Sequence, residues 1–396
     1  MISVINRIAN GIDGLIEEGI VSKDKYIVLF GLHRYSFAMR TILSHRNIQV
    51  YAFLSDDEGT IIKTRRDVKD FACRYLRSER DAIELLILGK DSISNDRNYV
   101  ILVAEENYEE KKEKLVRAGY IENKDFYKVY GFYENDIDGV ISNKKILDLD
   151  QIKAYEREML NLVDDICRNN NLRYWVCGGT MLGAVRHQGF IPWDDDIDIF
   201  LPLEDYMKFM EIFPHSNRYS LKGYGPNGGD EFYYIFAKLL DNQTLLDDDL
   251  VIVRELTNIF IDIFPLVGLP KDQEEREKFF VDYQECEKSI IQDFYATDGA
   301  LSVFEKRFPE QERFLRKYKF DESSYVGVLG TRYGNRDCTT RDAYKSTLRM
   351  KFDDIEVNVP VGYDEYLSNL YGDDYMSIPP VSKRKSLHML KAYWAD

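Results

Sequence analysis

Four aspartates near the middle of the chain are the residues best suited to chemistry. The run Asp194–Asp196 leads directly into the alternating segment Ile197–Ile199. Side chains two residues apart share one face of a strand, so Asp196 and Asp198 are predicted side by side, with Asp194 in line if the strand begins early. Neighbouring carboxylates repel each other and resist desolvation. A divalent cation, Mg²⁺ or Mn²⁺, would remove that cost because it takes carboxylate oxygens as ligands.

Asp262 is a third candidate acid. It is the lone charge in the apolar alternation Thr257–Gly268, where such a carboxylate is costly without a partner. If this strand lies beside the strand of Asp196 and Asp198, three carboxylates converge on one or two metal ions, as phosphoryl transfer requires. Whether Asp262 is a metal ligand or a general base stays open.

A glycine pair upstream opens a predicted strand-to-helix turn. Glycines let the backbone approach a phosphate, and a helix N-terminus offers free N–H groups. Side chains that follow could cap the helix or donate to phosphate oxygens. The candidate donor-phosphate ligands are Gly178, Gly179, Thr180, Arg186, His187 and Lys238.

Each of these residues has a structural explanation when taken alone. A glycine pair is usually a turn, Thr180 a cap, Arg186 an ion-pair partner, His187 a loop residue, and Lys238 an edge residue that reaches solvent. An EF-hand calcium loop is excluded, because its sixth position needs glycine and holds Ile199 here. The ordered combination of glycines, helix, paired aspartates and a distant strand aspartate favours a functional site.

The elements that must position these residues fall into two predicted domains. Residues 1–140 alternate apolar strands (Tyr26–Gly31, Gln49–Asp57, Glu84–Gly89 and Tyr99–Ala104) with amphipathic helices, which predicts a parallel, Rossmann-like α/β domain. A glycine fingerprint does not follow Gly31, so a dinucleotide site is disfavoured. A docking, regulatory or acceptor-recognition role is expected instead.

Residues 150–396 are predicted to form an α+β catalytic domain with a helical C-terminal part. A helix is expected over Leu149–Asn171, strands over Glu231–Asp241 and Thr257–Gly268, and helices from Lys271 to about Tyr318.

Composition restricts the partners and the location. The 396 residues carry a formal net charge of −16, which argues against nucleic acid as the main partner. The basic stretch Val381–Lys385 is more simply a solvated charge run. Five scattered cysteines without a CxxC pair fit reduced thiols in a cytoplasmic protein. No apolar run approaches the roughly 20 residues that span a bilayer, so at most peripheral contact at the inner face of a membrane is expected.

The segment Tyr174–Phe209, YWVCGGTMLGAVRHQGFIPWDDDIDIFLPLEDYMKF, resembles the signature of the LicD family of phosphotransferases, which are similar in fold to nucleotidyltransferases. Weaker matches are FAKLLDNQT (Phe236–Thr244), IDIFPLVGLP (Ile261–Pro270) and LYGDDYM (Leu370–Met376). The resemblance runs from about residue 150 to the C-terminus and does not cover residues 1–140.

The resemblance implies transfer of a phospho-alcohol, typically phosphocholine from CDP-choline, onto a hydroxyl of a glycan, lipid-linked oligosaccharide or teichoic-acid precursor. It implies Asp196 and Asp198 as metal ligands and Gly178-Gly179 as the phosphate-binding turn, and places Asp262 as the third acid. Related members use CDP-ribitol or a comparable donor. A CDP-glycerol donor, a true nucleotidyltransferase that releases pyrophosphate, and a non-catalytic scaffold stay open, as does a homo-oligomer.

The mechanism expected from this resemblance is in-line attack of a sugar hydroxyl on the β-phosphorus of the donor, with CMP as leaving group. Arg186 and Lys238 would share the developing charge, and Asp262 would help to activate the hydroxyl. If choline is the donor alcohol, an aromatic cage should hold its quaternary ammonium, with Phe232, Tyr233 and Tyr234 as candidates.

Overall fold

The computed structural model describes residues 4–32, 34–56, 84–89, 93, 98–105, 108–131, 138–228, 234–248, 255–297, 302–331, 333–384 and 391–395. The chain divides by compactness into two units, which are not contiguous in sequence. The first includes Met1–Ser142 and Lys288–Val303, and the second includes Asn143–Leu250, Glu255–Glu287 and Phe304–Asp396. The second unit is therefore interrupted, unlike the continuous 150–396 domain expected from the sequence.

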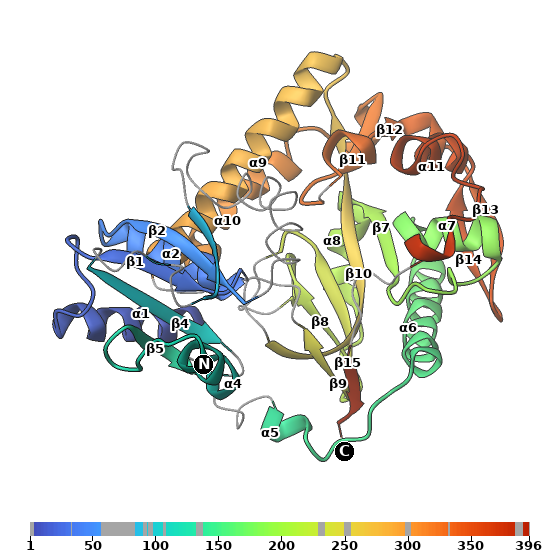
Figure 1. The fold of residues 1–396 in the computed structure, drawn as a ribbon. Coiled ribbons are helices and arrows are strands. Elements are labelled where there is room, and N and C mark those ends of the chain that lie inside the picture. The colour runs from blue at the N-terminus through green and yellow to red at the C-terminus, as the bar shows by residue number, and fades with distance from the viewer. Residues whose placement is uncertain are drawn as a thin grey trace. The chain divides into compact units, whose positions relative to one another are not determined.

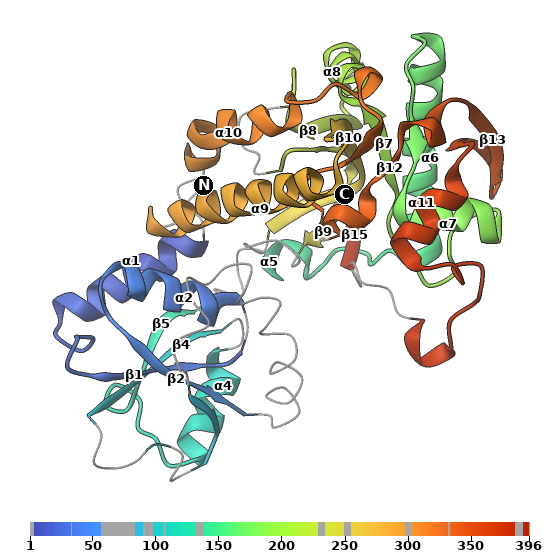
Figure 2. The same ribbon diagram turned by 90° about the horizontal axis from the view of Figure 1, so that it is seen from above.

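The first unit is built on a five-stranded sheet in the order β3-β2-β1-β4-β5, in which every pair of neighbours is parallel. Its strands are β1 (Tyr26–Phe30), β2 (Val50–Ser55), β3 (Glu84–Ile87), β4 (Tyr99–Glu105) and β5 (Phe126–Gly131). Its helices include α1 (Val4–Glu17), α2 (Arg34–His45), α4 (Tyr108–Arg117) and the short α5 (Asp138–Ile141). Helices α1 and α2 cover one face of the sheet and α4 covers the other (Figure 2).

The predicted parallel α/β region is thus confirmed, with strands at each of the four predicted places. The apolar runs form strands because a sheet covered on both faces buries both sets of side chains. Ile27, Val28, Leu29 and Phe30 are all fully buried. Strand β5 was not predicted, and His33 and Asp57 lie outside the described residues.

The second unit holds an eight-stranded mixed sheet, with β10 (Glu255–Leu269) as its long central strand (Figure 1). Strand β10 is parallel to β7 (Asp198–Pro202) on one side and antiparallel to β9 (Ala237–Asp248) on the other. The remaining strands of the sheet are β6 (Trp175–Val176), β8 (Tyr219–Gly223), β11 (Tyr325–Val328), β12 (Thr339–Thr340) and β15 (Lys391–Trp394). A separate hairpin joins β13 (Thr347–Phe352) to β14 (Ile355–Pro360).

Helices and short 3₁₀ turns complete this unit. The helices are α6 (Leu149–Asn169), α7 (Gly178–His187), α8 (Leu203–Ile212), α9 (Gln273–Ala296), α10 (Ser302–Leu315) and α11 (Tyr363–Tyr371). The last residues of α9, from Lys288 on, are counted with the first unit. The 3₁₀ turns are η1 (Phe320–Glu322), η2 (Gly334–Asp337), η3 (Arg341–Tyr344) and η4 (Val381–Lys383). Helix α6 begins at a capping box, in which the Asp148 carboxylate accepts from the Gln151 amide and the Gln151 side chain accepts from that of Asp148.

The alternation predicted for β10 is confirmed. Ile259, Ile261 and Ile263 are fully buried. On the opposite face Phe260 is buried as well, at 6% exposed, whereas Asp262 and Phe264 are only partly buried. One face of the sheet therefore belongs to the core, and the other is available for a site.

Three expectations need correction. Strand β7 begins at Asp198, so Asp196 lies in the extended segment before it rather than within it. The strand expected before Gly178 is only the two residues of β6. The C-terminal part is helical over α9 and α10 but then forms β11 to β14, because a strand edge of β10 remains to be paired after Leu266.

Among the described residues, every helix is too short or too polar to cross a bilayer. Free thiols are found at Cys167, Cys177, Cys286 and Cys338, as expected; Cys73 lies outside the described residues.

Candidate functional site

A row of four charged side chains crosses the partly buried face of the large sheet. Asp198 on β7 is the direct partner of Asp262 on β10, which pairs with Lys238 on β9, which pairs with Lys222 on β8. Partners across neighbouring strands project to the same face. We call Asp198, Asp262, Lys238 and Lys222 the charged row. The predicted meeting of the Asp198 and Asp262 strands is therefore observed.

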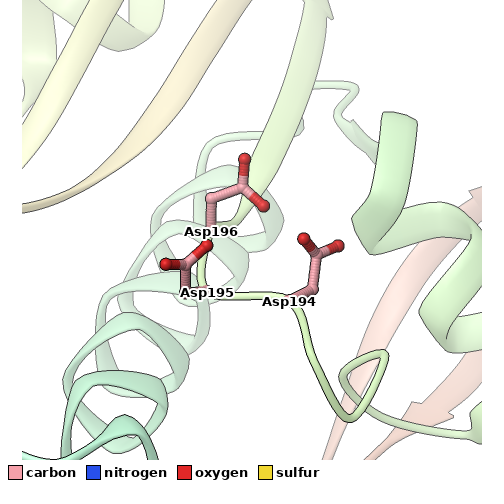
Figure 3. Close-up of side chains that lie close together, drawn as sticks. All are labelled: Asp194, Asp195 and Asp196. Carbon is pink, nitrogen blue, oxygen red and sulfur yellow. The ribbon is translucent and has the colours of Figure 1, made fainter. Parts of the chain in front are cut away.

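Asp194, Asp195 and Asp196 precede the row in an extended segment. One carboxylate oxygen from each lies within 4.8 Å of the others. The carboxylates of Asp194 and Asp196 point to the same side of the chain, while that of Asp195 points to another (Figure 3). Burial follows the same alternation, since Asp195 is 3% exposed and its two neighbours are partly exposed. Asp194, Asp196 and Asp198 thus lie along one side of this segment.

The glycine pair packs against these carboxylates. Gly178 has φ +51°, and a Cβ added there would lie 3.1 Å from Oδ2 of Asp198. A Cβ at Gly179 would lie 2.5 Å from Oδ2 of Asp194, closer than side chains tolerate. The missing side chains therefore leave the space in which two acids meet the first turn of α7. That turn is a favourable place for negative charge because its N–H groups are not used within the helix.

Thr180 holds the start of strand β7. Its hydroxyl accepts a hydrogen bond of 2.9 Å from the amide of Asp198, and the residue is 4% exposed. The amide of Cys177 donates to the carbonyl of Asp198 at 2.9 Å. The backbone of Asp198 is therefore fixed from both sides by the turn that begins α7.

A buried chain of hydrogen bonds fixes the glycine turn from behind. The amide of Gly178 donates to the Tyr366 hydroxyl at 3.2 Å, and that hydroxyl donates to the Asp337 carboxylate at 3.3 Å. The Thr331 hydroxyl also donates to Asp337. Tyr366 and Asp337 are 2% and 3% exposed. Residues almost 190 positions apart thus set the backbone of the turn.

Among the described residues of the site, the carboxylates outnumber the lysines of the charged row. Burial, followed by the charges of Asp196, Asp262 and Asp194, raises the pKa of Asp198 well above its usual range, and Lys238 opposes this only in part. Lys238 lies 3.2 Å from Asp262 and 3.1 Å from the ring centroid of Phe260. The first requirement of a cation site, an excess of carboxylates, is met.

Glu156 on α6 adds a further acid that the sequence reading missed. Its side chain is fully buried, and neither carboxylate oxygen accepts a hydrogen bond from a described residue. Burial and the charges of Asp196, Asp195 and Asp194 raise its pKa well above the ordinary value, while Lys153 lowers it. Its position was visible, because Glu156 interrupts the apolar stripe of Ile152 and Met159 at helical spacing.

Arg186 and His187 have contacts other than the predicted ones. The guanidinium of Arg186 donates to the carbonyl oxygens of Tyr375 at 2.6 Å and Ser377 at 3.2 Å, and to Nε2 of His187 at 3.0 Å. His187 packs edge-on against Trp193. These contacts attach the chain after α11 to the end of α7, so a direct phosphate role for either residue gains no support.

The carboxylate set fits a hard divalent cation. The donors are all oxygens, the glycine turn leaves a cradle that a Cβ would fill, and the charges of neighbouring carboxylates raise the pKa of Asp198. Asp194, Asp196, Asp198 and Asp262 are the residues that would hold it. The sequence predicts Asp194 in line with Asp196 only if the strand begins early, but its position against Gly179 places it with the others.

Comparison with known proteins supports a family assignment. Residues 171–294 match the model of the LicD/FKTN/FKRP nucleotidyltransferase domain. The chain is 26% identical over 254 residues to the lipopolysaccharide cholinephosphotransferase LicD of Haemophilus influenzae. The aligned stretch covers 59% of this chain and 94% of that protein. An uncharacterized protein of Rickettsia prowazekii is 30% identical over 45% of this chain and 60% of its own length.

A shorter stretch also matches the human ribitol 5-phosphate transferase FKRP, with 45% identity over 49 residues, 12% of this chain and 10% of that protein. The matched domain, residues 171–294, contains the glycine turn, the run Asp194–Asp196 and the charged row. The chain therefore carries a LicD-family domain over residues 171–294.

Proposed function

We propose that this chain is a metal-dependent phosphotransferase that moves a phospho-alcohol from a CDP-alcohol to a hydroxyl of a cell-surface glycan or teichoic-acid precursor, with CDP-choline as the favoured donor. The observation that carries the proposal is the pairing of Asp198 with Asp262 across β7 and β10, beside a glycine turn that packs on their cluster. The similarity to the Haemophilus influenzae protein, named for cholinephosphotransfer, supports choline.

The residues of the site divide the work by position. Asp194, Asp196 and Asp198 would hold Mg²⁺ or Mn²⁺, which when bound screens phosphate charge and polarises the phosphoryl oxygens. Asp262 shares the metal or accepts the proton of the acceptor hydroxyl. The first turn of α7 offers its amide groups to a phosphate, apart from the Gly178 amide, which is donated to Tyr366. Lys238, beside Asp262, is placed to attract the leaving phosphate. Catalysis then rests on positioning and fixed charge.

The products formed from different donors distinguish the proposal from its alternatives. The purified chain is incubated with Mg²⁺, a glycan acceptor and each of CDP-choline, CDP-ethanolamine, CDP-glycerol and CDP-ribitol, and the products are followed by ³¹P NMR. CMP release that depends on acceptor and metal is expected, fastest with CDP-choline. CMP release with CDP-ribitol or CDP-glycerol alone would move the assignment to that donor, as the similarity to the human ribitol 5-phosphate transferase allows.

A true nucleotidyltransferase is the second candidate, because the matching family model describes such a domain. Its product is pyrophosphate from a nucleoside triphosphate and a sugar phosphate. Pyrophosphate formation, with every CDP-alcohol left intact, would establish that function instead. The proposal includes a cytoplasmic location for the protein, with at most peripheral contact with the membrane. The possible homo-oligomer and the role of the first unit also stay predictions.

A further inference from the structure

Three aromatic side chains continue the partly buried face directly beside the charged row. Phe264 follows Asp262 by two residues on β10, while Phe236 and Tyr234 precede Lys238 by two and four residues. Ring centroids are 4.6 Å apart for Phe236 and Phe264, and 4.7 Å apart for Tyr234 and Phe236. We call Tyr234, Phe236 and Phe264 the aromatic ladder. All three residues are only partly buried, and Phe264 packs against the hydrophobic core at its inner side.

The pairing of strands explains the ladder. Asp262 pairs with Lys238 and Ile263 with Ala237, which is the last pair of the two strands. Phe236 comes directly before β9, and its ring lies against that of Phe264. On the other side of β10 the aromatic ladder ends at Phe264, because its partner Phe200 is fully buried. The rings around Phe200 are those of Trp175, Tyr344 and Tyr366. The accessible aromatic surface therefore runs from Phe264 across Phe236 to Tyr234, beginning about 7 Å from Asp262 along the strand.

We propose that the aromatic ladder binds the pyrimidine base of the donor nucleotide, while the charged row faces its phosphates. This inference rests on the proposed function. Aromatic rings offer a π-face to a base, and such stacking is worth about 1–3 kcal/mol per base. A ribose joins base and phosphate over a short span, so a base on Phe236 leaves the phosphates near Lys238.

Lys238 favours a neutral base with attached phosphates over the quaternary ammonium of choline on the neighbouring ring, whereas the carboxylates of the charged row act in the opposite sense. The Lys238 ammonium already lies 5.3 Å from the ring centroid of Tyr234. A second permanent cation on the neighbouring ring would be repelled, whereas a neutral base bearing phosphates is attracted. The rings also form a tilted stack, at 32° and 41° between neighbouring planes, rather than walls facing each other around a cation. Tyr234 therefore belongs to a base platform here, and the cage candidates Phe232 and Tyr233 lie outside the described residues.

Binding measurements test this without turnover. Calorimetry in Mg²⁺ compares CMP with phosphocholine for the full chain and for Phe236→Ala, Phe236→Leu and Phe264→Leu. Leucine keeps apolar volume while removing the π-face, so the leucine variants still report if the alanine variant unfolds. We expect CMP affinity to fall at least fivefold in each variant, with phosphocholine affinity unchanged. Tyr219→Ala, a partly buried aromatic of β8 outside the ladder, should leave both unchanged.

A second readout comes from Phe236→Trp, whose emission should be quenched by CMP and not by phosphocholine. Weaker phosphocholine binding with unchanged CMP binding would overturn the inference and make the ladder a choline site. Unchanged affinities for both, or a wild-type chain that does not bind CMP, would also overturn it. Ladder-dependent CMP binding without CDP-alcohol turnover would keep the inference and reject the proposed function. CDP-alcohol turnover together with a CMP affinity that the ladder variants leave unchanged would keep the proposed function and reject the inference.

Discussion

Single carboxylates in this sheet differ in how much their burial costs, depending on the charges that surround them. Asp198 lies among acids, whereas Asp241 on β9 is fully buried and paired with Arg218 at 2.9 Å. We predict that Asp198→Asn raises the free energy of unfolding by about 1–3 kcal/mol in metal-free buffer, because it relieves repulsion. Activity should fall at least about 100-fold. Thermal denaturation in EDTA and CMP release measure the two effects.

Asp241→Asn is the matched variant for this comparison. It removes one partner of an ion pair, but burial raises the pKa of Asp241 in spite of the Gln243 amide and Arg218, so the change also removes a costly buried charge. Because these two effects oppose each other and Arg218 is one-third exposed, stability should stay within about 1 kcal/mol of the wild type. The two aspartate-to-asparagine changes on one sheet thus differ in the size of their effect. Destabilisation by both changes would mean that the charge of Asp198 is already compensated within the protein.

Glu156 should behave like Asp198 in stability. We predict that Glu156→Gln raises the melting temperature in EDTA and reduces the further increase caused by Mg²⁺, because the amide removes one charge from the acid cluster. Asp165→Asn, an exposed position of the same helix, is the control and should change neither value. A metal-free melting temperature below that of the wild type would contradict the argument.

Asp337 gives the fold a pH dependence of its own. Burial raises the pKa of Asp337 to about 6, although hydrogen bonds from Thr331 and Tyr366 oppose the shift. A carboxyl with a raised folded pKa stabilises the fold below its unfolded value of about 4, and this contribution is lost as pH rises through about 6. The loss is about 3 kcal/mol at most, from 1.36 kcal/mol per pKa unit.

Asp337→Asn should remove this slope. Its amide group keeps an acceptor for Tyr366 and gains a donor toward Thr331. We expect the variant to be more stable than the wild type at pH 7.5 and equal to it near pH 4, as measured by urea denaturation across that range. Asp342→Asn, at an exposed position, is the control. A less stable variant at pH 7.5 would show that the ionised carboxylate is fully satisfied in the fold.

At the scale of elements, the glycine turn is the part least tolerant of added atoms. We predict that Gly179→Ala displaces the Asp194 carboxylate, because the new Cβ would lie 2.5 Å from its Oδ2, and weakens Mn²⁺ binding by roughly 10-fold or more. The fold should lose little, since the end of one side chain can move. Gly14→Ala within α1 has nothing within 4 Å and should stabilise the helix by up to about 1 kcal/mol with no effect on metal. Unchanged Mn²⁺ affinity in Gly179→Ala, measured by electron paramagnetic resonance, would remove Asp194 from the metal set.

Periodicity explains which elements could be predicted. The two-residue alternation around Asp262 fixed its face and its buried neighbours, and covered parallel strands such as Tyr26–Phe30 are visible as apolar runs. The start of β7 could not be read, because Asp196 continues the alternation although ladder pairing begins two residues later.

Long-range contacts explain what the sequence could not show. Arg186 is a plausible phosphate ligand by type, but its donors go to carbonyl oxygens of Tyr375 and Ser377, about 190 residues away. The hydrogen bond from Gly178 to Tyr366 likewise joins residues 188 positions apart. Local pattern specifies strand and helix, whereas a hydrogen bond between remote segments depends on the completed fold.

At the scale of the whole molecule, function is expected to be confined to one of the two units. Among the described residues, the only group of three or more clustered metal-ligand side chains lies in the second unit, at Asp194–Asp196. A ligand that binds only the native state raises protection from hydrogen exchange in the elements whose opening breaks the site. Mg²⁺ and CMP should therefore increase protection from hydrogen exchange in the second unit and not in the first.

We predict that Mg²⁺ increases protection from hydrogen exchange at α7, β7 and the middle of β10. CMP should extend this protection to the first residues of β9. The parallel strands β1, β2 and β4 should exchange at the same rate with and without either ligand. Asp198→Asn is the control, because it should abolish the Mg²⁺ effect while leaving exchange in β1 and β4 unchanged. Protection that appeared in β1 or β4 would mean that the first unit binds a ligand itself or is coupled to the second. Hydrogen exchange detected by mass spectrometry resolves these outcomes, since the strands of the two sheets fall in different peptides.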